Sequence, residues 1–225
     1  MAVFAAPVSK PAPWPMSVGA EGIAAAQFAR CGFDVLVQAG RDKPWYDLVV
    51  TKGGNLLKVS VKASDNGEWA LTSGFIRRVA ETNGMRVDCL SAIDMWRAGY
   101  GSRTVCCLVQ FEGAAIHELP RVYLASPDEI ASAMRETAAR IGRCTLLEMY
   151  EWTAANGART IEMLPERWHF SQDRVQELLM SQGSNATAAS TPPRTTIAPA
   201  PVPISASAPG PRLVPDPVPE LAMSV

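Results

Sequence analysis

The chain has 225 residues, enough for one globular domain with a sizeable core but not for two once its Pro-rich end is set aside. Although 48% of the residues are hydrophobic, no apolar run approaches the roughly 20 residues that cross a bilayer, which predicts a soluble protein with no membrane partner. The formal charge of −1 excludes a general attraction to nucleic acid. Residues 1–104 nevertheless hold 12 Lys and Arg against 9 Asp and Glu, so any basic face belongs to this part.

The N-terminal part of the chain predicts a leader followed by a helix. Residues 1–16 contain four prolines that interrupt every apolar stretch, which favours a flexible leader over a signal peptide. Ser17 can cap a helix that runs to about Cys31, with Ala24 and Phe28 on one stripe. Gly32 is the residue type that ends a helix in the left-handed conformation.

Three short runs of β-forming residues come next, at 33–38, 46–50 and 56–63. The last two are joined by Thr51-Lys52-Gly53-Gly54-Asn55. A Gly-Gly-Asn connection between β-branched runs is a strong hairpin signal. We therefore predict an antiparallel hairpin over 46–63.

The rest of the chain predicts further strands, two helices and a tail. Residues 87–93, 104–111 and 122–124 resemble strands, Ser126 begins a helix that runs to about Ile141, and another helix follows Ser171. From residue 183 the sequence consists mainly of Ala, Pro, Ser and Thr, typical of a disordered tail that is either a passive spacer or docks a protein. The expected fold class is α/β (α+β), with helices flanking a mixed β-sheet. The expected boundaries are a leader at 1–16, a core at 17–142, a helical extension packed on it at 143–182, and the tail at 183–225.

The cysteines predict a reduced, cytoplasmic protein without structural zinc. They form an odd set with no CxxC pair and no histidine at zinc-ligand spacing, namely Cys31, Cys89, Cys106, Cys107 and Cys144. The adjacent Cys106 and Cys107 would point to opposite faces of a strand, which favours packing over a vicinal disulfide or a nucleophile.

Alternation along the predicted hairpin separates an apolar row from a polar one. Leu57, Val59 and Val61 share one face, whereas Lys58, Ser60 and Lys62 share the other and suggest a solvent-facing groove. Asp47, at the start of the neighbouring strand, could approach the polar row. A carboxylate and a lysine placed together can bind a divalent metal and position a water. Spacing alone leaves open that Lys62 is an exposed strand lysine and Asp47 a turn-side carboxylate.

The segments GAEGIAAAQFARCGFDVLVQ, WYDLVV and KGGNLLKVSVKAS, taken in this order, resemble the core of the PD-(D/E)XK nuclease superfamily. The similar subgroup has a YDLVV…VQVK core. The resemblance implies a restriction-endonuclease-like fold and a metal-dependent endonuclease that hydrolyses DNA phosphodiester bonds with Mg²⁺ or Mn²⁺. It implies that Glu21 is the helix acid, that Glu21 and Asp47 bind the metal, and that Lys62 is the catalytic lysine.

Ser60 departs from this pattern, because it occupies the catalytic position where the superfamily has Glu, Asp or Gln. A serine hydroxyl is a poorer ligand for a hard cation than a carboxylate. Three interpretations stay open: a degenerate site that no longer cuts, a working site in which water replaces the third ligand, or an acid that has migrated to Asp65 or Glu68.

The implied partner is DNA, with Lys58, Arg77 and Arg78 as candidate phosphate contacts, although isolated surface charges are often simply solvated. A homodimer is left open. The alternative function is a catalytically degenerate protein of the same fold that binds nucleic acid or a protein partner without cutting. A small-molecule enzyme on an unrelated α/β fold has no motif to support it.

Overall fold

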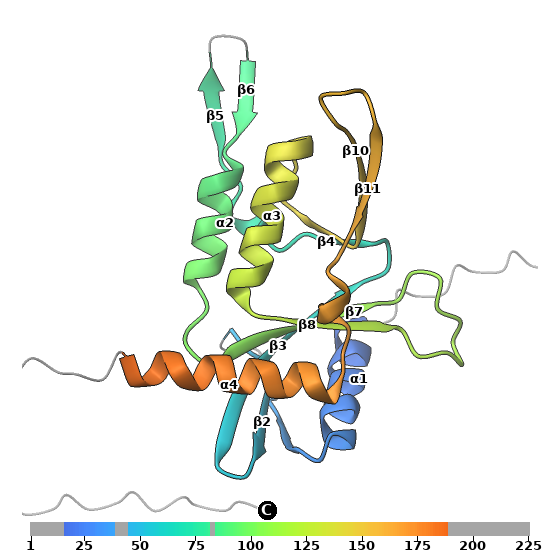
Figure 1. Ribbon diagram of the computed structural model, residues 1–225, viewed down its shortest axis with the longest axis vertical. Coiled ribbons are helices and arrows are strands. Elements are labelled where there is room, and N and C mark those ends of the chain that lie inside the picture. The colour runs from blue at the N-terminus through green and yellow to red at the C-terminus, as the bar shows by residue number, and fades with distance from the viewer. Residues whose placement is uncertain (1–15, 39–44, 82–83, 189–225) are drawn as a thin grey trace, which may run out of the picture. The chain divides into compact units, whose positions relative to one another are not determined.

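The computed structural model describes residues 16–38, 45–81 and 84–188, and of residues 78–81, 84–86 and 182–188 only the backbone (Figure 1). These residues belong to one unit. The predicted leader, apart from Met16, lies outside the described residues, as does residue 189 onward. Residues 183–188, assigned to the tail from the sequence, are instead helical.

The central sheet has five strands in the order β1-β2-β3-β7-β8. The first three form an antiparallel meander, β7 runs parallel to β3, and β8 pairs antiparallel with β7. The sheet is therefore mixed, which confirms the expected fold class. Its strands are β1 Asp34–Val37, β2 Leu48–Lys52, β3 Asn55–Ser64, β7 Thr104–Gln110 and β8 Arg121–Ala125.

The predicted hairpin is formed by β2 and β3, and its two glycines form the turn as expected. Gly53 and Gly54 have φ of 57° and 82°, the left-handed values that a two-residue hairpin turn requires at both positions. The register pairs Leu48 with Val59 and Lys52 with Asn55. This register directs the apolar row of β3 toward one face of the sheet and the polar row toward the other.

One face of the sheet is covered by α1 (Met16–Arg30) and α4 (Gln172–Ala188). The helix α1 buries Ala20, Ala24 and Phe28, which recur every four residues and so share a face. Ser17 lies within the helix rather than capping it, while Gly32 has the expected positive φ of 77° just after its end. The buried Leu57, Val59 and Val61 of β3 belong to the core on this face.

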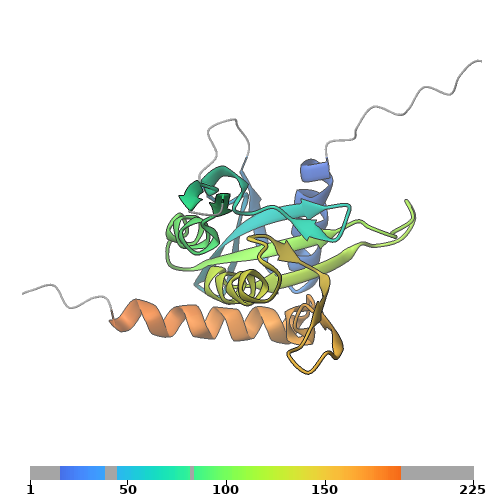
Figure 2. The same ribbon diagram turned by 90° about the horizontal axis from the view of Figure 1, so that it is seen from above.

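The opposite face is covered by α2 (Cys89–Ala98) and α3 (Pro127–Ile141), which lie side by side (Figures 1 and 2). The strand predicted at 87–93 is wrong. Asp88 caps a helix there by accepting a hydrogen bond from the Ser91 N–H, and Ala92, Ile93 and Trp96 are buried at helical spacing. An apolar run this short is compatible with either a strand or a helix, and burial against α3 favours the helix.

The predicted start of α3 is confirmed in detail. The Ser126 hydroxyl accepts from the Glu129 N–H, and the Glu129 carboxylate accepts from the Ser126 N–H. Pro127 occupies the first helical position, where a missing N–H has no cost. The helix ends at Gly142, whose φ is 71°.

The segment 143–182, predicted as a helical extension, contains strands as well as α4. β10 (Met149–Thr153) and β11 (Arg159–Met163) form an antiparallel hairpin, and the turn η2 (Glu166–Trp168) leads back to the core. β9 (Leu146–Leu147) pairs with β4 (Glu68–Trp69), a strand that follows β3. The remaining elements are the turn η1 (Ser73–Phe75) and the hairpin of β5 (Arg78–Glu81) and β6 (Gly84–Val87).

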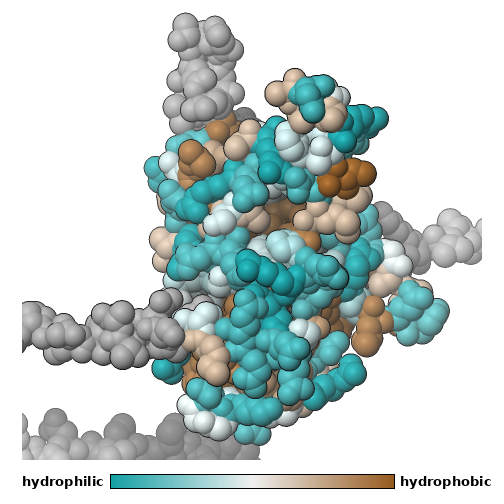
Figure 3. All heavy atoms as spheres, in the orientation of Figure 1, coloured by the Kyte–Doolittle hydropathy of each residue, from teal (hydrophilic) through white to brown (hydrophobic). Residues whose placement is uncertain are grey.

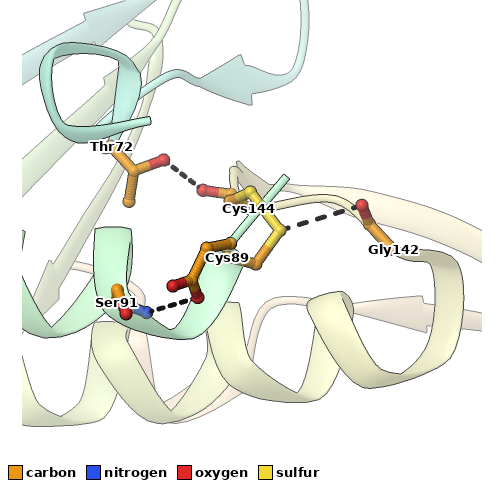
Figure 4. Close-up of a disulfide and its surroundings, with 6 residues drawn as sticks. Thr72, Cys89, Ser91, Gly142 and Cys144 are labelled. Atoms are coloured by element: carbon orange, nitrogen blue, oxygen red, sulfur yellow. Dashed lines mark hydrogen bonds between the residues drawn. A yellow bond between two sulfur atoms is a disulfide. The ribbon is translucent and has the colours of Figure 1, made fainter. Parts of the chain in front are cut away.

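A disulfide joins Cys89, at the start of α2, to Cys144, just after α3, with 4.9 Å between the Cα atoms (Figure 4). Close by, the Thr72 hydroxyl donates to the Cys144 carbonyl at 2.5 Å. The expectation of fully reduced cysteines is therefore wrong. As predicted, Cys106 and Cys107 are buried on opposite faces of the sheet.

A buried carboxylate links β8 to the segment after α3. Glu148 receives two hydrogen bonds from the Arg121 guanidinium, at 2.6 and 2.8 Å, and one from the Tyr123 hydroxyl at 2.5 Å. Burial by itself would raise the pKa of Glu148, but the bonds from Arg121 and Tyr123 outweigh it and hold the pKa below its ordinary value. The ionised form is thus favoured by the fold.

Because the folded-state pKa of Glu148 is lowered, its contribution to stability is present above the ordinary value of 4.5 and is lost as the pH falls below it. We expect Glu148→Gln to lower the free energy of unfolding at pH 7 by about 1–3 kcal/mol. When the pH falls below 4.5, the stability of the variant should also decrease less than the stability of the intact protein. Urea unfolding across this pH range measures both effects. The exposed Glu136→Gln is the control, and equal pH profiles for all three proteins would contradict the prediction.

Among the described residues, no helix combines the length and apolar character needed to cross a membrane. The face drawn in Figure 3 is mostly hydrophilic, with apolar residues in small separate groups. Exposed apolar side chains include Leu36, Val37 and Trp45. Trp45 borders the pocket described next.

Candidate active site

Three candidate site residues from three parts of the chain line one pocket of about 520 Å³. Glu21 comes from α1, Asp47 immediately precedes β2, and Lys62 lies in the second half of β3. Much of the remaining wall is aromatic, formed by Trp45, Trp69, Trp96 and Tyr100. The fold therefore brings two carboxylates and one ammonium group to a single hollow.

Backbone and side-chain hydrogen bonds fix the position of Asp47. Its N–H donates to the Val59 carbonyl at 2.8 Å, and its carbonyl accepts from the Gln38 N–H at 2.9 Å. Its Oδ2 accepts from the Val61 N–H at 2.7 Å. The carboxylate is thus held against β3, one residue before Lys62, in an orientation that does not depend on a ligand.

The polar row of β3 is only partly open to solvent. Lys58 and Lys62 are half-buried, whereas Ser60 is 1% exposed. The predicted solvent-facing groove is therefore wrong at its centre, because α2 and the residues after it cover this face of the sheet. Ser60 does not line the pocket.

Ser60 lies within a small buried polar group. Its Oγ makes no hydrogen bond of ordinary geometry to a described residue, and Cys106 is its partner on β7. Burial raises the pKa of the Tyr100 hydroxyl, while the nearby Ser60 hydroxyl acts in the opposite direction. Burial likewise raises the pKa of Cys106 to about 12, although the charge of Lys62 lowers it. Cys106 is therefore a protonated thiol at neutral pH and no nucleophile.

Neither Asp65 nor Glu68 supplies the acidic group that is missing at Ser60. Glu68 forms an ion pair with Arg143 at 2.6 Å, and Asp65 is exposed. Neither residue lines the pocket, whereas Trp69, which follows Glu68 on the same strand, does. Adjacent strand residues point to opposite faces, so Trp69 in the pocket directs Glu68 away from it.

The residues of the pocket fit a magnesium-type ion that is only partly held by protein. No group of three or more His, Cys, Asp or Glu side chains that could hold a metal occurs within 16–38, 45–81 and 84–188. Mg²⁺ usually keeps several waters and is bound by one or two carboxylates together with substrate phosphates. Glu21 and Asp47 supply two carboxylates, which is enough for this mode of binding.

The candidate phosphate contacts do not form one patch. The Lys58 ammonium lies over the Tyr46 ring, 5.4 Å from its centroid, and Arg77 is exposed just before β5. The side chain of Arg78 lies outside the described part. The β5–β6 hairpin and the β2–β3 turn lie at opposite ends of the described unit (Figure 1). Only Lys58 belongs to the strand that carries Lys62.

Sequence reasoning missed the aromatic wall of the pocket. Two signals could have indicated it. Trp45 directly precedes Tyr46 and Asp47, and Trp96 and Tyr100 are only four residues apart.

No family model and no curated protein matches this chain. The chain is similar in structure to a bacterial homing endonuclease. That match has 16% sequence identity and a TM-score of 0.35, and it covers 78% of this chain and 97% of the endonuclease. A Holliday junction resolvase from the archaeal hyperthermophile Archaeoglobus fulgidus matches with 14% identity and a TM-score of 0.29, over 50% of this chain and 78% of the resolvase.

Proposed function

We propose that this protein is a metal-dependent endonuclease that hydrolyses DNA phosphodiester bonds in the pocket of Glu21, Asp47 and Lys62. The observation that carries the proposal is the convergence of these three side chains, from α1, the start of β2 and β3, on one hollow. Residues so far apart in sequence have no local reason to meet. The sequence resemblance assigns complementary roles to the same three residues.

The chemistry follows from the charges. A divalent ion such as Mg²⁺ or Mn²⁺ would offset phosphate charge when bound by Glu21 and Asp47. Asp47 is oriented by the Val61 N–H before any ligand arrives. Lys62 places an ammonium group beside the carboxylates, where it orients the attacking water and stabilises the negative charge that develops on the phosphate.

Ser60 stands where the superfamily that the sequence resembles has Glu, Asp or Gln, and neither Asp65 nor Glu68 lines the pocket in its place. The Ser60 hydroxyl is buried behind the wall of the pocket rather than presented to it. Such a site depends on Glu21, Asp47 and the substrate for its oxygen ligands. We therefore expect weak metal binding and cleavage that requires a high concentration of the divalent ion.

The test is cleavage of plasmid and branched DNA by the full chain at increasing Mg²⁺ or Mn²⁺. EDTA should abolish cleavage. Asp47→Asn keeps an oxygen for the Val61 N–H but removes the charge, and should raise the Mg²⁺ concentration for half-maximal cleavage at least about tenfold. Asp34→Asn, an exposed carboxylate on β1 outside the pocket, is the matched control.

The result decides between the proposed function and its alternative. An intact chain that binds DNA but leaves it uncut in both metals would favour the non-cutting protein of the same fold. Cleavage that persists unchanged in Asp47→Asn would show that the proposed pocket is not the active site.

A further inference from the structure

Trp45 packs against two aromatic rings at the edge of the candidate active site although 49% of its surface is exposed. Its ring stacks on Phe75, with centroids 6.1 Å apart and planes 23° apart. It meets Tyr100 edge-on, with centroids 5.4 Å apart and planes 75° apart.

The backbone also makes room for this ring. Gly99, at the end of α2, has no side chain where Trp45 approaches. A Cβ at position 99 would lie 2.7 Å from two carbons of the ring, closer than non-bonded atoms tolerate. Two aromatic partners and a glycine therefore define one orientation for a half-exposed indole.

One ammonium group lines the pocket that Trp45 borders, and further cations lie along the neighbouring segment of the chain. Tyr46, the next residue, carries the Lys58 ammonium over its ring. The Lys58 N–H donates to the carbonyl of Arg103 at 2.8 Å, and Arg103 is exposed. Lys62 lines the pocket together with Trp45. An aromatic surface of fixed orientation that shares its pocket with the Lys62 ammonium suits a ligand that has both flat apolar rings and negative charge.

We propose that Trp45 is a stacking platform for an unpaired DNA base, so that the preferred substrate is single-stranded DNA, or DNA with an unpaired nucleotide, next to the bond that is cut. The proposal rests on the proposed function and specifies its substrate class. Bases in an intact duplex are stacked on one another and cannot present a face to Trp45, whereas unpaired bases stack readily on aromatic side chains. A platform that is already fixed loses little conformational entropy on binding.

The test compares binding of the full chain to a short single strand, to the same strand with abasic residues in place of its bases, and to a matched duplex. Ca²⁺ replaces Mg²⁺, and a gel checks that the strands stay intact. The intact chain should bind the normal strand at least about fivefold more tightly than the abasic strand. Trp45→Leu should lose at least about fivefold on the normal strand and little on the abasic one, while Trp45→Phe keeps part of the affinity.

Two glycine variants test the orientation of the ring without removing it. Gly99→Ala should displace Trp45 and weaken binding to the normal strand. Gly101→Ala, where a Cβ would meet nothing within 4 Å, should leave it unchanged. Equal weakening by both glycine variants would overturn the role assigned to the position of Trp45.

The outcomes separate this proposal from the proposed function. If the intact chain binds neither strand nor the duplex and cuts no DNA, the proposed function fails and this proposal fails with it. If the chain cuts DNA but does not distinguish the normal strand from the abasic one, only the stacking proposal is overturned. That comparison needs no variant, so a folding defect in Trp45→Leu cannot obscure it.

Discussion

Lys62→Met is expected to lower kcat for DNA cleavage by about 100- to 10,000-fold, the range that one positioned group contributes to proton transfer or charge stabilisation. Methionine keeps most of the length of the half-buried side chain and removes only the ammonium. The fold and the carboxylates Glu21 and Asp47 should therefore persist. Single-turnover cleavage at saturating Mg²⁺ measures the change in the chemical step.

Lys58→Met is the matched control for this experiment, because it removes the same charge from the same face of β3. We expect it to raise KM through weaker attraction of the phosphate backbone while kcat stays within about threefold, since surface charges act mainly on association. Lys62→Arg, which keeps the charge but changes its shape, should recover only a small part of the activity. A similar fall in kcat for Lys58→Met and Lys62→Met would show that Lys62 acts only through its positive charge and not through its position in the pocket.

Breaking the Cys89–Cys144 disulfide is expected to lower the free energy of unfolding by up to about 4 kcal/mol, the chain-entropy value for a loop of this length. The two cysteines are 55 residues apart, so the bond excludes many extended conformations of the unfolded chain. It also ties α2 to the end of α3 on the face that covers Ser60. Cys144→Ser, or the intact protein in dithiothreitol, should unfold at a lower denaturant concentration.

Cys31→Ser is the control for the disulfide, because Cys31 is a free cysteine on the other side of the sheet. It should shift the unfolding midpoint much less than Cys144→Ser and should keep its sensitivity to dithiothreitol. Alkylation of the unreduced protein followed by mass spectrometry gives an independent measurement. Labelling of Cys89 and Cys144 as free thiols in air-exposed protein would contradict the disulfide.

Local features of the sequence determined much of the central fold. The Gly53-Gly54 turn fixes the register of β2 and β3, because only residues that accept positive φ form this tight turn. Alternation along β3 then places Lys62 and Ser60 on one face and Val59 on the other. The capping box of α3 is likewise a local hydrogen-bond pattern. These predictions succeeded because each depends on neighbouring residues alone.

Other features were decided by contacts that no local pattern contains. Residues 89–98 form a helix because Ile93 and Trp96 bury themselves against α3 and the sheet. The hairpin β10–β11 was missed because its residues alternate between exposed and half-buried, so its strands have weak apolar patterns. The disulfide depends on two helices meeting, which the spacing of the cysteines does not indicate.

The candidate site divides in the same way. The sequence by itself indicated Asp47 and Lys62, because a hairpin of known register brings its two strands together. For Glu21, only the family resemblance implied a place beside Asp47; local patterns could not determine it, because it requires α1 to pack across β3. Nor could the sequence show that Ser60 is buried beside Tyr100 and Cys106, or that Trp45 stands exposed at the rim. Burial is a property of the assembled layers, so only the tertiary structure decided which polar residues of this chain can meet a substrate.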